Sequence, residues 1–152
     1  MEVALRSDII QDCDIQILLV SYPRNPTITI INLYNDKNHQ NNRATKLIRR
    51  LPLISNQPTI ITGNWNMHHI LWANQDQVQH EQETIEMVEW LTQQGFRLLN
   101  IPGEATYLGH SRNGYTSVLD LTFANGPATQ SGCPSDWAIN QEIIYGSDHY
   151  AI

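Results

Sequence analysis

Residues 59–72 read TIITGNWNMHHILW, and they place a polar cluster directly after a run that is typical of a buried strand. The four residues TIIT are β-branched and uninterrupted, which predicts a central strand of a sheet. Two asparagines, Asn64 and Asn66, then bracket a tryptophan. Functional side chains often lie at strand ends, because the sheet fixes them while the loop leaves them accessible. The stretch therefore predicts a strand with a site at its end.

The composition is that of a globular protein with few charges. The chain has 152 residues, of which 41% are hydrophobic and 16% are charged. We expect residues 1–152 to form a single domain with its own core. The net charge of −6 argues against a protein that coats DNA by charge alone. An acidic chain can still act on phosphate if a divalent cation lies between its carboxylates and the phosphate.

Cysteine usage and hydropathy bear on the cellular location. Cys13 and Cys133 lie far apart and fit neither a disulfide framework nor a zinc site, which favours reduced thiols in an intracellular protein. The start of the chain, MEVALRSDII, carries charges and no long apolar run, so no signal peptide is expected. No stretch approaches the roughly 20 apolar residues of a membrane helix, and no membrane partner is expected.

The remaining pattern alternates strands with helices, which predicts an α/β fold around a mixed sheet. The first two strands flank the turn PRNP and should form an antiparallel hairpin, and Pro52 should end the first helix. Strands are predicted at 14–22, 27–34, 59–62, 96–100 and 117–124, and helices at 43–54 and 80–95.

Four motifs share their order and approximate spacing with a known family. They are NLYND (32–36), GNWNMHHILW (63–72), SVLDLTFA (117–124) and GSDHYAI (146–152). Together they resemble the endonuclease/exonuclease/phosphatase family, and most closely the endonuclease domain of non-LTR retrotransposons. A Ser-Asp-His tripeptide alone occurs in many proteins, but four motifs in register are specific. The resemblance implies a four-layered α/β sandwich, in which two mixed sheets pack face to face with helices outside.

The resemblance also implies hydrolysis of phosphodiester bonds in DNA with Mg²⁺ or Mn²⁺. On this pattern Asp148 matches a carboxylate at the metal, and His149 matches the histidine that contacts the scissile phosphate. Asp120 matches the carboxylate that orients this histidine. Asn66 matches an asparagine that binds the phosphate or the attacking water, and Tyr34 matches a tyrosine aimed at the phosphate.

Two further residues are given supporting roles. Ser147 would be a hydrogen-bond partner within its motif, and His68 is expected to pack or to face the substrate. Adjacent histidines point apart, so His68 and His69 are not expected to share a metal. The chemistry of phosphodiester hydrolysis also requires these residue types, independently of the resemblance. A cation held by carboxylates neutralises charge on the phosphate oxygens, and an acid fixes the ring orientation of a histidine.

The same residues also have plain structural explanations. Asn64 and Asn66 could be turn residues, since asparagine tolerates left-handed turns. Trp65 and Trp72 are expected in the core. Asp120 is harder to explain in this way, because an unpaired buried carboxylate is costly and should have a partner.

Position 64 departs from the family pattern, which has aspartate there. An amide has nearly the same shape but cannot take up a proton at neutral pH, so turnover should be lower by roughly two to four orders of magnitude. Three explanations stay open: an engineered substitution, a decayed element, or a binding role that never needed the acid.

The family pattern also begins with two strands, the second carrying a metal-binding glutamate, and nothing here matches them. On this comparison the domain lacks its first strands and should bind metal more weakly. Unpaired sheet edges invite pairing with another chain, and a homodimer is one way to cover them.

The first hypothesis is therefore a metal-dependent DNA endonuclease of the retrotransposon kind, working in the nucleus and impaired by Asn64 and the missing glutamate. The second is a nucleic-acid or protein interaction module that keeps the fold and has lost the chemistry. A third is a phosphatase acting on small phosphoesters.

Overall fold

The protein is built on a six-stranded mixed sheet, with strand order β1-β2-β3-β4-β8-β5, and a small two-stranded sheet, β6-β7. The computed structural model describes residues 1–36, 38, 43–53, 56–73, 81–109, 115–133, 136–142 and 147–152. Its strands are β1 (Glu2–Leu5), β2 (Ile15–Ser21), β3 (Ile28–Tyr34), β4 (Thr59–Asn64), β5 (Phe96–Leu98), β6 (Tyr107–Leu108), β7 (Thr116–Ser117) and β8 (Asp120–Asn125). Its helices are α1 (Ala44–Ile48), α2 (Gln82–Gln93) and α3 (Gly126–Gln130).

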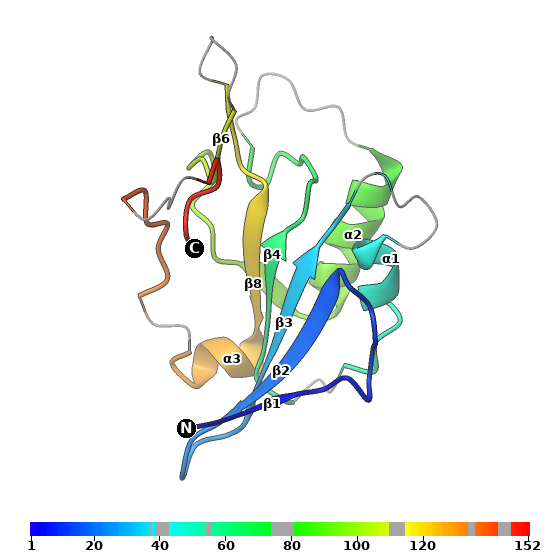
Figure 1. Ribbon diagram of the computed structural model, residues 1–152, viewed down its shortest axis with the longest axis vertical. Coiled ribbons are helices and arrows are strands. Elements are labelled where there is room, and N and C mark those ends of the chain that lie inside the picture. The colour runs from blue at the N-terminus through cyan, green and yellow to red at the C-terminus, as the bar shows by residue number, and fades with distance from the viewer. Residues whose placement is uncertain are drawn as a thin grey trace.

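One face of the large sheet is buried beneath α1 and α2 (Figure 1). Ile48 of α1 and Leu91 of α2 pack there against a row of residues that are register partners in neighbouring strands. Full burial of one aliphatic side chain stabilises the fold by roughly 2 kcal/mol. The row crosses four strands through Ile17, Ile31, Ile61 and Phe123. This row is the centre of the core.

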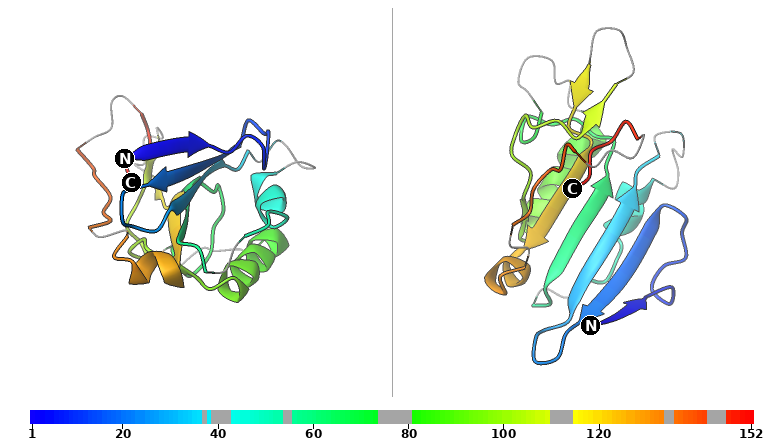
Figure 2. Two further views of the ribbon diagram at one scale, coloured as in Figure 1. Left: turned by 90° about the horizontal axis from the view of Figure 1, so that it is seen from below. Right: turned by 60° about the vertical axis from the view of Figure 1, so that its left-hand side comes forward.

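The opposite face of the sheet changes character along its strands. Towards the start of β3 it is apolar, because Leu18, Ile30 and Ile60 are register partners. Towards the end of β3 and β4 it becomes polar, with Asn32 paired to Thr62. The right-hand view of Figure 2 looks onto the sheet and shows β3 and β4 running parallel toward this polar end.

Several sequence predictions are confirmed. The α/β class with a mixed sheet is observed, and β2 and β3 form the predicted antiparallel hairpin. β4 is central, with β3 and β8 on either side, and it runs two residues further than predicted, to Asn64. α2 lies within the predicted range 80–95, of which residue 80 is outside the described residues. Apart from these predictions, no helix in the described part of the chain is long and apolar enough to cross a membrane, and Cys13 and Cys133 are not joined to each other.

The first helix is shorter than predicted. The prediction covered 43–54, of which residue 54 is outside the described residues, whereas α1 ends at Ile48 and the chain then turns up to Leu51. Proline disfavours the helical conformation in the residue before it, so the influence of Pro52 begins earlier than its own position.

The strand predicted over 117–124 is divided in two. Ser117 ends β7 and Asp120 begins β8, with Val118 and Leu119 between them. The backbone amide of Leu119 donates to the Thr106 hydroxyl, and its carbonyl accepts from Trp65, so neither group is available for continuous strand pairing. The alternation of side chains predicted the strand but not this interruption.

Gly63 allows β3 and β4 to lie close together. Its φ is 130°, and a Cβ placed on it would lie 2.0 Å from the carbonyl oxygen of Leu33. A side chain at this position would push on backbone atoms of the neighbouring strand, which cannot rotate away.

Gly63→Ala should therefore lower the free energy of unfolding by on the order of 3 kcal/mol, measured by urea denaturation. Gly126→Ala is the matched control, since a Cβ there meets no atom within 4 Å and its φ is not positive. It should change stability by less than about 1 kcal/mol, toward greater stability. Equal effects of the two substitutions would contradict the role given to Gly63.

Candidate active site

Three of the predicted site residues lie in one row where the central strands meet the polar end of the sheet. Tyr34 of β3 is the register partner of Asn64 of β4, and Asn64 is the partner of Asp120 of β8. Register partners project from the same face of a sheet. The three side chains therefore share the face opposite α1 and α2.

The C-terminal segment brings His149 to this row. In Figures 1 and 2 the segment, in red, runs beside β8. His149 Nδ1 lies 2.7 Å from Asp120 Oδ2. The segment is held by backbone hydrogen bonds, in which Leu108 donates to Asp148 and Tyr150 donates to Thr106, both at 2.8 Å. Residues far apart in the sequence thus meet in one place.

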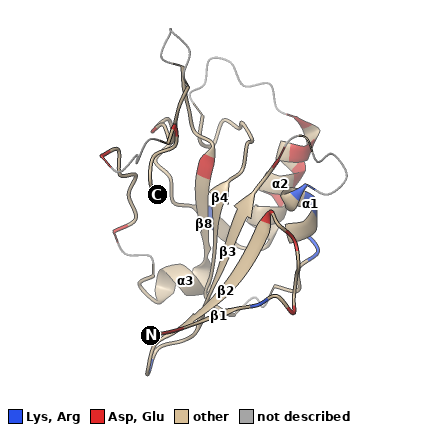
Figure 3. Cartoon of the chain, viewed as in Figure 1, with Lys and Arg blue, Asp and Glu red and all other residues tan. Residues whose placement is uncertain are grey.

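Asp120 is the one charged residue in the four central strands β2, β3, β4 and β8. Figure 3 shows these strands in tan apart from a red segment at the upper end of β8. Asp120 is 8% exposed. Burial raises the pKa of Asp120 above its ordinary value of 3.8, and the hydrogen bond and charge of His149 oppose this rise. An ionised carboxylate only accepts hydrogen bonds, so Nδ1 carries the proton and Nε2 is left for a substrate.

Asn64 and Asn66 form a tight turn after β4. Asn64 Oδ1 accepts from the backbone amide of Asn66 at 3.0 Å, and Asn66 has a left-handed φ of 48°. The side-chain amide of Asn66 donates to the carbonyl of Asn35 at 3.0 Å. Both asparagines therefore do serve the turn, and the same bonds fix them at the end of the row.

Asn35 stabilises this turn through hydrogen bonds, although it was not predicted as a site residue. It is 1% exposed. Its backbone amide donates to the carbonyl of Asn64, and its side-chain amide donates to the carbonyl of Trp65, both at 2.8 Å. The available signal was its place directly after Tyr34, where a polar residue follows a buried strand.

Two of the remaining predicted residues lie beside His149, and the third, His68, lies in the loop after β4. Ser147 Oγ accepts from the backbone amide of His149 at 3.0 Å, within the Ser-Asp-His motif. Asp148 Oδ1 lies 3.9 Å from His149 Nε2, and the Asp148 side chain is 32% exposed. His68 is half-buried in the loop after Asn66. Of these, Ser147 and Asp148 join the histidine directly.

The donor set suits loose binding of Mg²⁺ or Mn²⁺. Mg²⁺ commonly binds proteins through one or two carboxylates and keeps several waters. Asp148 supplies one partly exposed carboxylate, while Asp120 is engaged by His149. Within the described residues, three potential ligand atoms come within 4.8 Å of one another only at Asp12, Cys13 and Asp14. These are sequence neighbours at the Tyr34 end of the row, where the carbonyl of Asp14 accepts from the backbone amide of Tyr34 at 2.8 Å.

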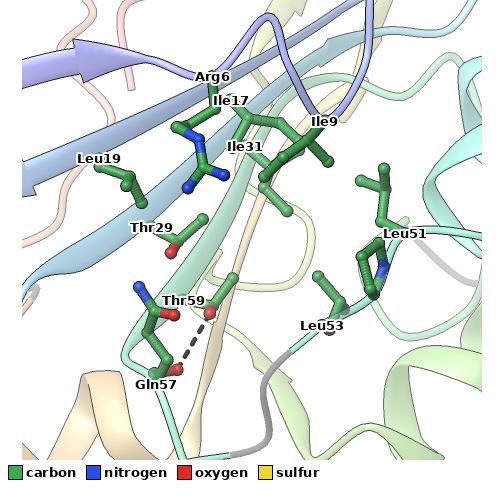
Figure 4. Close-up of a pocket in the computed structure, with 11 residues that line it drawn as sticks. Arg6, Ile9, Ile17, Leu19, Thr29, Ile31, Leu51, Leu53, Gln57 and Thr59 are labelled. Carbon is green, nitrogen blue, oxygen red and sulfur yellow. Dashed lines mark hydrogen bonds between the residues drawn. The ribbon is translucent and has the colours of Figure 1, made fainter.

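A separate pocket lies on the helix-covered face of the sheet. Figure 4 shows it between the strands and residues 51–53, with a volume of about 340 Å³. Its walls are mainly apolar, with Arg6, Thr29 and Gln57 at one side. It shares no residue with the row at Asp120, so the candidate site is an open surface rather than this pocket.

The buried carboxylate predicts an unusual pH dependence of stability. Because the pKa of Asp120 is raised in the folded state, its contribution to stability is fully present below its ordinary value of 3.8 and is lost as pH rises through the folded pKa. The melting temperature of the wild type should therefore fall relative to Asp120→Asn as pH increases from about 3 to about 7.

Asp8→Asn provides a control with the opposite sign. The hydrogen bond from Arg6 lowers the pKa of Asp8. The melting temperature of the wild type should therefore rise relative to that of Asp8→Asn as pH increases over the same range. If the melting temperature of the wild type also rose relative to that of Asp120→Asn, the effect of His149 on the pKa of Asp120 would be larger than the effect of burial.

Comparison with known proteins agrees with this geometry at the level of the fold. The endonuclease domain of TRAS1, a telomere-specific non-LTR retrotransposon, superposes with a TM-score of 0.76 and 18% identity, over 98% of this chain and 65% of that one. An endonuclease/exonuclease/phosphatase from Beutenbergia cavernae DSM 12333 superposes with a TM-score of 0.58 and 13% identity, over 90% of this chain and 37% of that one. Sequence comparison with curated proteins gives no match.

The chain thus spans about two thirds of the TRAS1 domain, at 65% of its length. A family model described as endonuclease-reverse transcriptase matches residues 28–152, which include the row from Tyr34 to Asp120 and the segment with His149. The chain belongs to this endonuclease-reverse transcriptase family and has the fold of the endonuclease/exonuclease/phosphatase proteins.

Proposed function

We propose that the chain hydrolyses phosphodiester bonds in DNA with Mg²⁺ or Mn²⁺, at a turnover limited by Asn64. The observation that carries this proposal is the 2.7 Å contact between His149 and Asp120, at the end of the row that contains Tyr34 and Asn64. Membership of the endonuclease-reverse transcriptase family supports a nuclease-type function. A chromosomal DNA substrate would place the protein in the nucleus.

The side chains divide the work as follows. Asp120 accepts a hydrogen bond from Nδ1 of His149 and stabilises the imidazolium, so that the ring presents Nε2 to the scissile phosphate. Tyr34 and Asn66 donate hydrogen bonds where charge develops on the phosphate. Asp148 would hold the cation, which would neutralise charge on the phosphate oxygens.

Asn64 occupies the position at which a base would act on the attacking water. It can orient that water through hydrogen bonds but cannot take its proton at neutral pH. The residue is already fixed by its bond to Asn66, so aspartate could occupy the same place with the same turn. Asparagine in place of aspartate at position 64 therefore limits catalysis and leaves the fold unchanged.

Asn64→Asp should therefore raise the rate of plasmid nicking by roughly 10² to 10⁴ in the presence of Mg²⁺ or Mn²⁺. Asn32→Asp is the matched control, because it adds the same charge to the same face two residues before Tyr34 on β3. The control should leave nicking unchanged, and the double variant Asn64→Asp, His149→Gln should lose the gain.

The alternative is an interaction module that binds DNA or protein without cutting. Asn64 favours this alternative, because its side chain accepts a hydrogen bond within the turn and cannot take up a proton at neutral pH. Fluorescence anisotropy with labelled duplex DNA separates the two functions. A folded Asn64→Asp variant that binds DNA and does not nick it would favour the module.

We also propose that β1 pairs with a second copy of the chain. All four residues of β1 are exposed, and it lies at the edge of the sheet with Val3 and Leu5 51% and 59% exposed. Sedimentation equilibrium should show a dimer that Val3→Lys disrupts, because charged side chains protect sheet edges. A wild-type monomer at high concentration would contradict this pairing.

A further inference from the structure

The pocket on the helix-covered face lies where the cover of helices ends. α1 stops at Ile48, so residues 51–53 and the loop after β1 close this part of the face in place of a helix. The volume of about 340 Å³ falls in the range of roughly 300 to 1,000 Å³ that is typical of small-molecule sites. Such sites combine mainly apolar walls with a few polar groups that fix the orientation of the ligand.

The apolar part of the pocket is made by three separate segments. Ile17 and Ile31 come from the neighbouring strands β2 and β3, and Leu51 and Leu53 come from the segment after α1. Ile9 of the loop after β1 lies beside them (Figure 4). Walls of aliphatic side chains favour an apolar body, because its surface is removed from water on binding.

The polar part of the pocket is gathered on the other side. Figure 4 shows the guanidinium of Arg6 pointing toward Thr29, with Gln57 beyond it. The backbone holds these groups in place. The amide of Arg6 donates to the carbonyl of Ile17 at 2.8 Å, and the carbonyl of Gln57 accepts from the Thr59 hydroxyl at 3.0 Å. The polar groups are therefore fixed before a ligand enters.

Arg6 supplies the charge of this side. Its Nε and Nη2 donate to the two carboxylate oxygens of Asp8, each at 2.7 Å. A guanidinium has five N–H donors, so Asp8 uses two of them and the others lie on Nη1 and Nη2 at the tip. The Asp8 side chain is 64% exposed and that of Arg6 is 34% exposed, so the acid lies on the solvent side. The tip of a guanidinium fits a second carboxylate through two parallel bonds.

We propose that this pocket binds small carboxylic acids with an aliphatic body. The carboxylate accepts from the tip of Arg6, and the chain lies against the aliphatic wall that includes Ile31 and Leu51. The pocket shares no residue with the row at Asp120, so this site is independent of the proposed function.

Octanoate and 1-octanol are the probes, because they share a chain and differ in the charge of the head. Binding at pH 7 is followed by ¹H–¹³C correlation spectra of the isoleucine and leucine methyl groups. Arg6→Met removes the guanidinium, and Arg97→Met is the matched control, since Arg97 lies on β5 at the opposite edge of the sheet from β1. Asp8→Asn removes the competing charge and keeps an acceptor for Arg6.

Octanoate should shift the methyl signals of Ile17, Ile31 and Leu51 until they saturate, while Ile60, on the opposite face, should not move. Arg6→Met should weaken octanoate by about threefold to tenfold, a modest loss because water partly screens a guanidinium that is one third exposed. It should leave the weaker binding of 1-octanol unchanged. Asp8→Asn should tighten octanoate, and Arg97→Met should alter neither ligand.

Three outcomes would overturn the proposal. The pocket methyls could fail to shift with octanoate, or Arg6→Met could weaken both ligands equally. They could also shift with protein concentration alone, which would show that a second copy of the chain fills the pocket. If circular dichroism shows that Arg6→Met does not fold, Arg6→Gln replaces it with the same outcomes. The result does not depend on whether Asn64→Asp nicks DNA.

Discussion

The register of β3, β4 and β8 is the constraint on which the candidate site depends. A shift of one residue in any of these strands would send Tyr34, Asn64 or Asp120 to the face beneath the helices. The register is set by the opposite face, where Ile31, Ile61 and Phe123 must stay in the core. The hydrophobic core thus places the polar row, although the two lie on opposite faces of the sheet.

Charge alone does not explain how such a chain would bind DNA. The chain has 9 basic and 15 acidic residues. Two of the basic residues, Arg43 and Arg49, form ion pairs with Glu83 and Glu86 of α2, on the helix side of the sheet. Non-specific attraction to phosphates is therefore weak, and hydrogen bonds together with a divalent cation would have to supply the affinity.

The sequence predicts those parts of the fold that depend on local patterns. The hairpin of β2 and β3 follows from two β-branched runs around PRNP. The cost of burying a lone carboxylate predicted that Asp120 has a partner, and the family resemblance implied that this partner is His149. The helix at α3 was not predicted. It is capped by Asn125, the last residue of β8, whose side chain accepts from the backbone amide of Ala128. In the sequence this short cap resembles an ordinary turn.

Other parts depend on contacts that no local pattern contains. The roles of Asn35 and Thr106 cannot be read from their neighbours in the sequence, because each residue acts through hydrogen bonds to residues farther along the chain. The break between β7 and β8 has the same origin, since it is made by Thr106 and Trp65. Site residues with distinctive side chains can be predicted, whereas the residues that hold them are found only when the chain is folded.

The attachment of the C-terminal segment has a consequence for how activity and folding are related. His149 and Asp148 are carried by a segment that pairs with residues 106–108 through a few backbone hydrogen bonds, outside the six-stranded sheet. Opening of this segment costs far less than disrupting the core, and such local openings precede global unfolding. On warming, the histidine would leave its carboxylate while the sheet is still intact. The highest temperature at which the protein functions would then be set by the opening of this C-terminal segment and not by the melting of the domain.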